Sequence, residues 1–396
     1  MSAPQHHPAT TKQRGAALLV MLVIVVMGIA AALINSLSTT VLKTARQETT
    51  AAALAQAKDA LIGYAVTYGD SHSSSYGYLP CPDTNNDGSS DTNQGSTYCA
   101  GKDIPVVGRL PWKSLGLPPL RDGYSECLWY AVSGTFKAVA GSGNMNEVMN
   151  WDTLGQFTIQ NTNGTILAGT TAYKRPVAVI FSAGPPLNAQ SHQPSNGQEC
   201  SGDASNDVAV YLESGNAFSP PGSPPATPLA LTAGNSRSAS NNDIALWITS
   251  GDIFTRIKKR SDFPAKISAL MGDAYFQTEP TSGTKGTGNV VCDNLDAANR
   301  KLCTSWLEML FLTELAPPSP VTIDWVLTTG DCSRVLIFGG QRTTEQSRQT
   351  DTDKTEPANY LEDPDLTAFA FPTNNFSGSS TFNANLPSMD LLRCLP

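Results

Sequence analysis

The chain has 396 residues, which is enough for one large domain or two ordinary ones. Charged residues make up 15% of it, well below the roughly 25% of typical soluble domains, while 40% hydrophobic residues still support a sizeable core. The formal net charge of −8 argues against nucleic-acid binding, because nucleic-acid-binding domains carry a basic surface. With 32 Gly and 27 Pro, the composition is typical of a loop-rich exported protein.

An apolar segment near the N-terminus is the first predicted element. Residues 16–34 read AALLVMLVIVVMGIAAALI, without a charged or polar side chain. As a helix they would span about 28 Å, close to the roughly 30 Å hydrocarbon core of a bilayer, so we expect a membrane-spanning helix. Lys12 and Arg14 precede the segment, which predicts a cytoplasmic N-terminus and an exported remainder. A secretory signal peptide is the rival interpretation, but its apolar region usually has only about 7 to 15 residues.

The helical pattern continues beyond this apolar segment. No Pro occurs between Asn35 and Tyr68, and helix-forming residues dominate the stretch. Apolar residues recur there at steps of three and four, which is the pattern of an amphipathic helix. They are Leu54, Ala57, Leu61, Ala65 and Tyr68. We therefore predict one helix over residues 16–68, whose second half buries one face against a globular domain.

The start of this helix resembles a known export signal. The residues Lys-Gln-Arg-Gly at 12–15, followed by the long apolar run, resemble the signal of type IV prepilins over residues 12–68. The resemblance implies a leader over residues 1–15, cleavage by a prepilin peptidase after Gly15, and methylation of the new N-terminal Ala16. It also implies that the mature helix sits in the inner membrane and later packs against the helices of other pilin or pseudopilin subunits in a filament.

Two positions depart from the usual pattern of that family. Ala16 and Val20 stand where most members have Phe and Glu. Some minor pilins and large secretion pseudopilins also lack this Glu, and the chain resembles that subset. The resemblance implies a non-enzymatic subunit, present in few copies near the tip of a type IV pilus or a type II secretion filament.

The same resemblance implies a location and leaves alternatives open. The expected location is the inner membrane, as a single-pass protein with a periplasmic C-terminal domain, or a filament on the cell surface. One alternative is a pilus-tip adhesin that uses the large C-terminal region. The other is a membrane-anchored periplasmic protein outside any filament, including a hydrolase. The sequence does not separate a pilus from a secretion or DNA-uptake filament.

The rest of the chain predicts an α+β fold. The long helix would pack on an antiparallel sheet, with inserted loops and a smaller helical element. Residues 69–215 are expected to form a pilin-like globular region and residues 243–396 a C-terminal α+β region. Between them, residues 216–242 are rich in Pro and Ser and predict a linker or long loop.

Local patterns predict several elements within these regions. Strands are expected where Val, Ile and aromatic residues cluster, at 175–182, 207–212 and 243–250. One helical pattern begins near Asp252 and is interrupted by Pro264, and a second covers residues 295–315. Residues 321–329 and 333–340 predict a pair of strands around a turn at Gly330 and Asp331.

All eight cysteines lie C-terminal to the apolar segment, and no Cys-x-x-Cys pair occurs. An even number of scattered cysteines predicts disulfides formed in an oxidising compartment. Nearness in the chain favours the pairs Cys81–Cys99 and Cys292–Cys303, and the remaining connectivity is open. The full set is Cys81, Cys99, Cys127, Cys200, Cys292, Cys303, Cys332 and Cys394.

One loop has the spacing of a calcium site. Oxygen-bearing side chains stand at its first, third, fifth and ninth positions, with Gly88 at the sixth. In calcium loops the Gly allows a sharp turn and hard oxygen ligands suit Ca²⁺, so Ca²⁺ is the predicted cofactor. Gln94 replaces the usual bidentate Glu at the twelfth position, and an Asx-rich surface turn is the alternative. The predicted ligands are Asp83, Asn85, Asp87 and Asp91.

Sequence signatures of catalysis are absent. The chain contains no G-x-S-x-G, H-E-x-x-H or G-x-x-x-x-G-K-[ST] motif, and we expect it not to be an enzyme. His72 and His192 lie in polar loop sequence and are expected at the surface. Five tryptophans are interpreted as core or interface aromatics rather than a carbohydrate platform. They are Trp112, Trp129, Trp247, Trp306 and Trp325.

Overall fold

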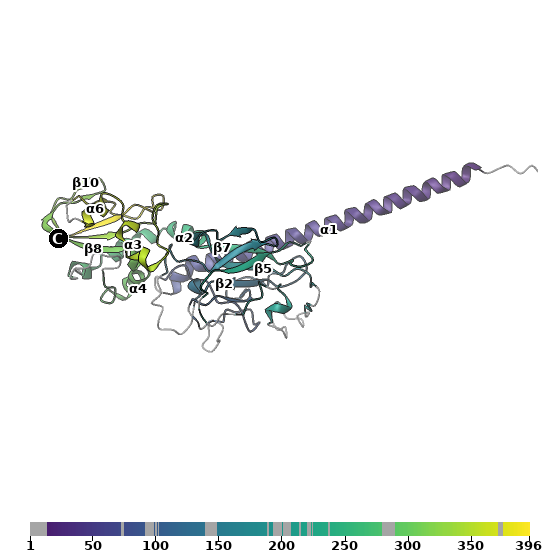
Figure 1. Ribbon diagram of the computed structural model, residues 1–396, viewed down its shortest axis with the longest axis horizontal. Helices are drawn as coiled ribbons and strands as arrows, with labels where there is room; N and C mark the ends of the chain where they lie inside the picture. The colour runs from purple at the N-terminus through teal and green to yellow at the C-terminus, as the bar shows by residue number, and fades with distance from the viewer. Residues whose placement is uncertain are drawn as a thin grey trace, which may run out of the picture.

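A computed structural model gives the fold. It describes residues 14–72, 75–91, 99, 101, 103–138, 149–187, 190–192, 200, 207–213, 215–219, 223, 225–236, 238–278, 290–370 and 375–396, and of these it leaves aside the side chains of 14–20, 28, 30–39 and 298. The molecule is elongated, with a long helix projecting at one end and the C-terminal strands at the other (Figure 1).

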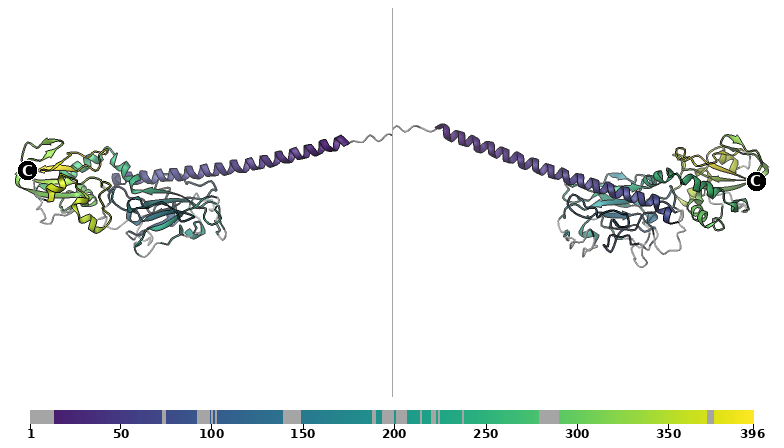
Figure 2. Two further views of the ribbon diagram at one scale, coloured as in Figure 1. Left: turned by 45° about the horizontal axis from the view of Figure 1, so that its top comes forward. Right: turned by 180° about the vertical axis from the view of Figure 1, so that it is seen from behind.

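Helix α1 (Arg14–Ser71) is 58 residues long and confirms the long N-terminal helix. Its second half lies on the globular body, where Leu54, Ala57, Leu61 and Ala65 are buried in the core. The predicted amphipathic stripe is therefore the face that packs. The first half of α1 extends away from the body in both views of Figure 2.

The prediction of a membrane-spanning first half is wrong for the part of α1 that the structure describes. Among the described residues, no helix is both long and apolar enough to cross a membrane. This finding also contradicts the predicted location, a single-pass inner-membrane protein with a periplasmic C-terminal domain.

A four-stranded antiparallel sheet lies under the second half of α1. Its order is β1 (Val106–Arg109), β2 (Trp129–Val132), β5 (Pro176–Ser182) and β7 (Ile244–Thr249). Side chains of β5 alternate between two cores: Ala178 and Ile180 share one core with α1, while Val179 and Phe181 belong to a second core. Because both faces of β5 are covered, its sequence is an unbroken apolar run rather than an alternating one.

The second core is closed by a smaller sheet. Its order is β4 (Ile166–Ala168), β3 (Phe157–Asn161) and β6 (Leu229–Ala233), with β3 and β6 parallel. The strand β6 falls within residues 216–242, the stretch predicted as a linker. Residues 208–210 form a 3₁₀ turn, so the strand predicted over 207–212 is wrong. This half of the body thus has three layers: α1, the four-stranded sheet and the three-stranded sheet.

Helices lead from this body into the C-terminal part. Helix α2 (Ser250–Lys258) begins at a capping box in which Thr249 and Asp252 each bond the other's backbone N–H. Helix α3 (Phe263–Met271) has Pro264 in its first turn, where Pro is tolerated because that N–H has no partner within the helix. Three more helices follow: α4 (Ala297–Trp306), α5 (Asp351–Thr355) and α6 (Asp365–Ala370).

Two further sheets complete the C-terminal part. One has the order β13 (Leu391–Leu395), β11 (Cys332–Phe338) and β8 (Leu310–Ser319). The other has the order β10 (Val326–Leu327), β9 (Thr322–Ile323) and β12 (Ser377–Gly378). Two predictions are wrong here. The helix expected over 295–315 ends at Trp306 and the chain continues as β8. Residues 322–327 form a hairpin of β9 and β10, which is joined by β12, while β11 pairs with β8 and β13.

An aromatic cluster joins the two parts of the molecule into one continuous core. The ring of Trp151 lies 4.4 Å from that of Trp306 and 6.1 Å from those of Phe338 and Phe382, measured between centroids. Such edge-on and offset contacts are favourable beyond the apolar area they bury. The C-terminal part is therefore attached through packed side chains, not through a flexible tether.

Candidate functional site

Among the described side chains, the longest run of exposed apolar residues lies on the projecting part of α1. Every side chain from Met21 to Met27 is exposed, from 45% at Val23 to 73% at Met21, and Ile29 is 57% exposed. Seven consecutive positions cover all sides of a helix, so this segment has no polar face. A contiguous apolar surface of this kind marks a place that partners cover. Because it surrounds the helix, it suits contact with more than one neighbour at once.

The second half of α1 is fixed to the body by polar contacts as well as by its apolar stripe. The Nζ of Lys58 donates to the carbonyl oxygen of Trp247 at 2.9 Å and lies 3.5 Å from a carboxylate oxygen of Asp252. Nearer the projecting part, a Cβ at Gly123 would come within 2.2 Å of the carbonyl oxygen of Arg46, so only Gly allows this close approach to α1.

Arg260 anchors the C-terminal end of α1. Its guanidinium donates to the carbonyl oxygen of Val66 at 3.1 Å and to Asp70 at 2.7 Å, and it pairs with Asp262 at 2.9 Å. Its hydrogen bonds hold the pKa of Asp262 well below the usual range. The helix is thus attached at its body end, and this attachment sets the direction in which the apolar half projects.

The predicted processing site lies at the beginning of α1. Gly15 is in the first turn of the helix, while residues 1–13 and the side chain of Ala16 lie outside what the structure describes. Cleavage after Gly15 therefore stays a prediction.

The cysteines form four disulfides, and none is free. The pairs are Cys81–Cys99, Cys127–Cys200, Cys292–Cys303 and Cys332–Cys394, with Cα–Cα separations from 5.2 to 6.3 Å. They include the two pairs that nearness in the chain favours. Two bonds close long loops, of 73 and 62 residues. Such cross-links stabilise the fold mainly by restricting the unfolded chain.

The predicted calcium loop folds as a turn held by its own carboxylates. Asp83 is buried, and its carboxylate accepts backbone N–H groups from Asn86 at 2.6 Å, Asp87 at 3.2 Å and Gly88 at 2.7 Å. Burial raises the pKa of Asp83 to about 6. Gly88 has a φ of +83°, and a Cβ there would meet the ring of Trp112 at 2.7 Å, so the sixth position requires Gly.

The other predicted ligands of this loop are similarly engaged. Asn85 accepts the N–H of Asp87, Asp87 accepts the N–H of Ser89, and Asp91 accepts the N–H of Thr84. Within the described residues, no three acidic, His or Cys side chains lie close enough to hold a metal. The geometry is that of the Asx-rich turn, and calcium binding stays a prediction.

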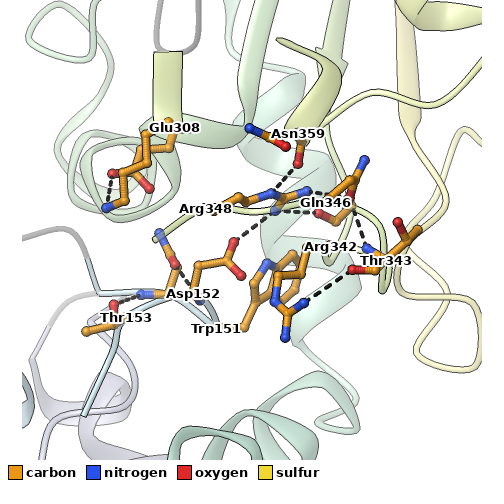
Figure 3. Close-up of polar contacts among 12 residues, drawn as sticks. Trp151, Asp152, Thr153, Glu308, Arg342, Thr343, Gln346, Arg348 and Asn359 are labelled. Atoms are coloured by element: carbon orange, nitrogen blue, oxygen red, sulfur yellow. Dashed lines mark hydrogen bonds and ion pairs between the residues drawn. The ribbon is translucent and has the colours of Figure 1, made fainter. Parts of the chain in front are cut away.

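A buried ion pair connects the two parts of the body (Figure 3). Arg348 is fully buried, and its Nη1 lies 2.8 Å from the Oδ2 of Asp152 and 3.1 Å from the carbonyl oxygen of Gly340. Its Nε donates to the carbonyl oxygen of Asn359, and its guanidinium lies 4.1 Å from the centroid of the Tyr360 ring. The donors of Arg348 thus meet carboxylate and carbonyl oxygens of the fold, so its role is to hold the parts together.

Acidic side chains line a cavity of about 290 Å³ beside α6. Burial raises the pKa of Asp365 to about 7, and burial also raises the pKa values of Glu362 and Asp390. Raised carboxyl pKa values in a cleft can mark an active site. Here, however, Asp365 accepts the N–H of Ser377, and Asp390 accepts those of Gly340 and Glu362, which are structural contacts.

The two histidines of the body are not arranged as a catalytic base. His72 is exposed and stacks on Tyr68 at 3.9 Å. His192 is not at the surface as predicted: its side chain is 4% exposed, lies 3.1 Å from Glu126 and stacks on Tyr211 at 4.7 Å. With every cysteine oxidised, no thiol is available as a nucleophile.

Comparison of the chain with protein-family models, with curated proteins and with solved structures finds no match.

Proposed function

We propose that this chain is a non-enzymatic structural subunit of a helix-packed filament, of the minor pilin or pseudopilin kind. One observation carries the proposal: α1 is anchored to the body by its second half, and its projecting part presents a segment, residues 21–27, that is apolar on every side. A helix of this form is stable in water only when other apolar surfaces cover it. Helices of neighbouring subunits are the partners that fit its length and shape.

The exposed apolar area is large enough to drive assembly. The eight large apolar side chains at 21–27 and 29 are about half to three-quarters exposed. Covering a side chain of this kind contributes about 1 to 2 kcal/mol, so the segment contributes on the order of 10 kcal/mol before the cost of association. Two or more neighbouring helices would share this contact.

The position in the filament follows from Val20 and the size of the body. In the family, a Glu in the apolar helix pairs with the N-terminal amine of a neighbouring subunit, because a buried carboxylate needs a cationic partner. This chain has Val20 at that position and so offers no carboxylate. After cleavage following Gly15, the amine of Ala16 could still meet a neighbour's Glu. That asymmetry suits a subunit at one end of a filament, and a large body is also easier to place at an end than in a repeated lattice.

Self-association of the full chain tests the proposal. The double substitution Ile24→Glu and Met27→Glu puts two carboxylates on one side of the exposed segment without touching the core. We expect the wild-type chain to form larger species as its concentration rises in analytical ultracentrifugation, and the double variant to remain monomeric. Thr49→Glu, on the exposed part of the anchored half, is the matched control and should associate as the wild type does.

Two results would contradict the proposal. A wild-type chain that stays monomeric at all concentrations shows that the apolar segment drives no assembly. Equal association of the wild type and the double variant shows that assembly uses another surface.

A further inference from the structure

The hairpin of β9 and β10 lies at the end of the molecule opposite the projecting half of α1 (Figure 1). Ile323 pairs with Val326, so Asp324 and Trp325 form a two-residue turn. Both have positive φ, +51° and +66°, as in a type I′ turn. That turn strongly favours Gly at its second position, because a residue with a Cβ is strained there. Trp325 occupies the position where Gly would be most stable.

The side chain of Trp325 is also hardly buried by the rest of the fold. It is 88% exposed, and the next two side chains, Val326 and Leu327, are 65% and 60% exposed. Of the six tryptophans it is the one fully at the surface, so of the two roles expected for the tryptophans, core or interface, it does not have the first. Within the described residues, β10 has β9 as its only neighbour in the sheet, which leaves its other edge open. An apolar open edge favours pairing with another chain.

The surroundings of the hairpin are acidic. A cavity of about 120 Å³ beside it is lined by Asp324, Trp325, Ser377, Gly378, Ser379 and Met389. Hydrogen bonds from Ser380, and to a smaller extent from Ser379, keep the pKa of Asp324 below its usual range, so its carboxylate is charged at neutral pH. Through Ser377 and Met389 this cavity adjoins the cavity beside α6, where burial raises the pKa values of Asp365 and Asp390 and so reduces their negative charge at neutral pH. Asp324 is therefore the anion that the hairpin presents, and neither cavity has a Lys or Arg among its described lining residues.

We propose that the Trp325 hairpin, residues 322–327, is a docking site for an extended polypeptide segment that combines basic and apolar side chains. Such a segment can add to the open edge of β10 and place its apolar side chains on Val326 and Leu327. A Lys or Arg of the segment can lie over the Trp325 ring beside the carboxylate of Asp324.

Trp325 is strained by its positive φ and its ring is not buried by the fold in return. A residue that breaks the Gly preference of its turn without packing in the core points to a role in recognition. Trp is also the residue type most enriched among the side chains that dominate interface energies. The carboxylate of Asp324 would repel an anionic membrane, which disfavours a lipid surface as the partner. The exposed aliphatic side chains of Val326 and Leu327 suit a polypeptide better than a sugar. The proposal goes beyond the filament proposal, since hairpin and projecting helix lie at opposite ends.

Peptide binding to the full chain tests the site. The probe is a fluorescently labelled peptide of alternating Lys and Val, and its counterpart has Glu in place of Lys. Fluorescence anisotropy should show binding of the Lys peptide and little binding of the Glu peptide. Trp325→Gly should weaken binding by about tenfold or more while its melting temperature equals or exceeds that of the wild type. Asp324→Asn, which tolerates positive φ, should also weaken binding.

A matched control comes from another exposed strand. Ile166 and Leu167 on β4 are 49% and 47% exposed, and replacing both by Ala should leave peptide binding unchanged. The proposal is overturned if the Lys peptide fails to bind at up to about 1 mM, if the Glu peptide binds equally well, or if Trp325→Gly binds like the wild type. Trp325-dependent binding to immobilised glycans or to vesicles, without peptide binding, also overturns it. Self-association should be the same in Trp325→Gly as in the wild type, so failure here is separate from failure of the filament proposal.

Discussion

Replacing Arg348 by Met removes one half of the buried ion pair that joins the two parts of the body. The carboxylate of Asp152, 2.8 Å from the guanidinium in the wild type, would then be buried without a counter-charge. The carbonyl oxygens of Gly340 and Asn359 would each lose a charged donor. Breaking a buried pair from one side typically costs about 3 to 5 kcal/mol, and Arg348→Met should lower the free energy of unfolding by that amount.

Urea unfolding of the disulfide-intact chain, followed by tryptophan fluorescence, measures this change. Arg256→Met is the matched control, because Arg256 and Asp59 lie at a similar distance, 2.9 Å, but their side chains are 53% and 69% exposed. Loss of an exposed pair should cost at most about 1 kcal/mol. The double variant Asp152→Asn and Arg348→Met removes both charges and should recover at least about 1 kcal/mol relative to Arg348→Met.

Equal losses in Arg348→Met and Arg256→Met would refute this reasoning. So would a double variant that is no more stable than Arg348→Met, since the cost would then come from lost packing and not from the unpaired carboxylate.

Three further predictions concern single carboxyl groups and the hairpin. Burial raises the pKa of Asp365 to about 7, above its unfolded value near 4, so the folded state holds the proton more tightly and the free energy of unfolding should fall as pH rises between these values. Asp365→Asn, in urea unfolding at about pH 5 and about pH 8, should show a smaller fall than the wild type; an identical fall would contradict this. Calcium should raise the melting temperature of the wild type in calorimetry but not that of Asp87→Ala, and the calcium prediction fails if chelator makes no difference to the wild type. Trp325→Gly should raise the free energy of unfolding by about 1 kcal/mol because it relieves a left-handed backbone; a loss of stability would show that the Trp ring packs in solution.

The elements with strong periodicity could be predicted from the sequence. The three- and four-residue spacing of Leu54, Leu61 and their neighbours identifies the buried face of α1, because local pattern and burial agree there. The unbroken apolar run of β5 also identifies a doubly covered strand. Only a 3₁₀ turn at Leu307–Met309 separates α4 from the apolar residues that form β8, and a short apolar stretch is compatible with helix or strand until its partner strands are known.

The features that depend on distant contacts could not be predicted. Arg348 and Asp152 are 196 residues apart, and Arg260 and Asp70 are 190 apart, so no spacing in the sequence links them. The same holds for the disulfides that close 73 and 62 residues, whereas the two short pairings follow from nearness. The sequence at the turn of the β9–β10 hairpin argues weakly against a hairpin, because type I′ turns favour Gly at the second position and this chain has Trp325 there.

The filament assignment is tested most directly by mass spectrometry of filaments sheared from cells that produce this protein. The account predicts that the chain is present in far fewer copies than the main subunit and that its first peptide begins at Ala16. Absence of the chain from the filaments, or an N-terminus at Met1 in the assembled form, would contradict it.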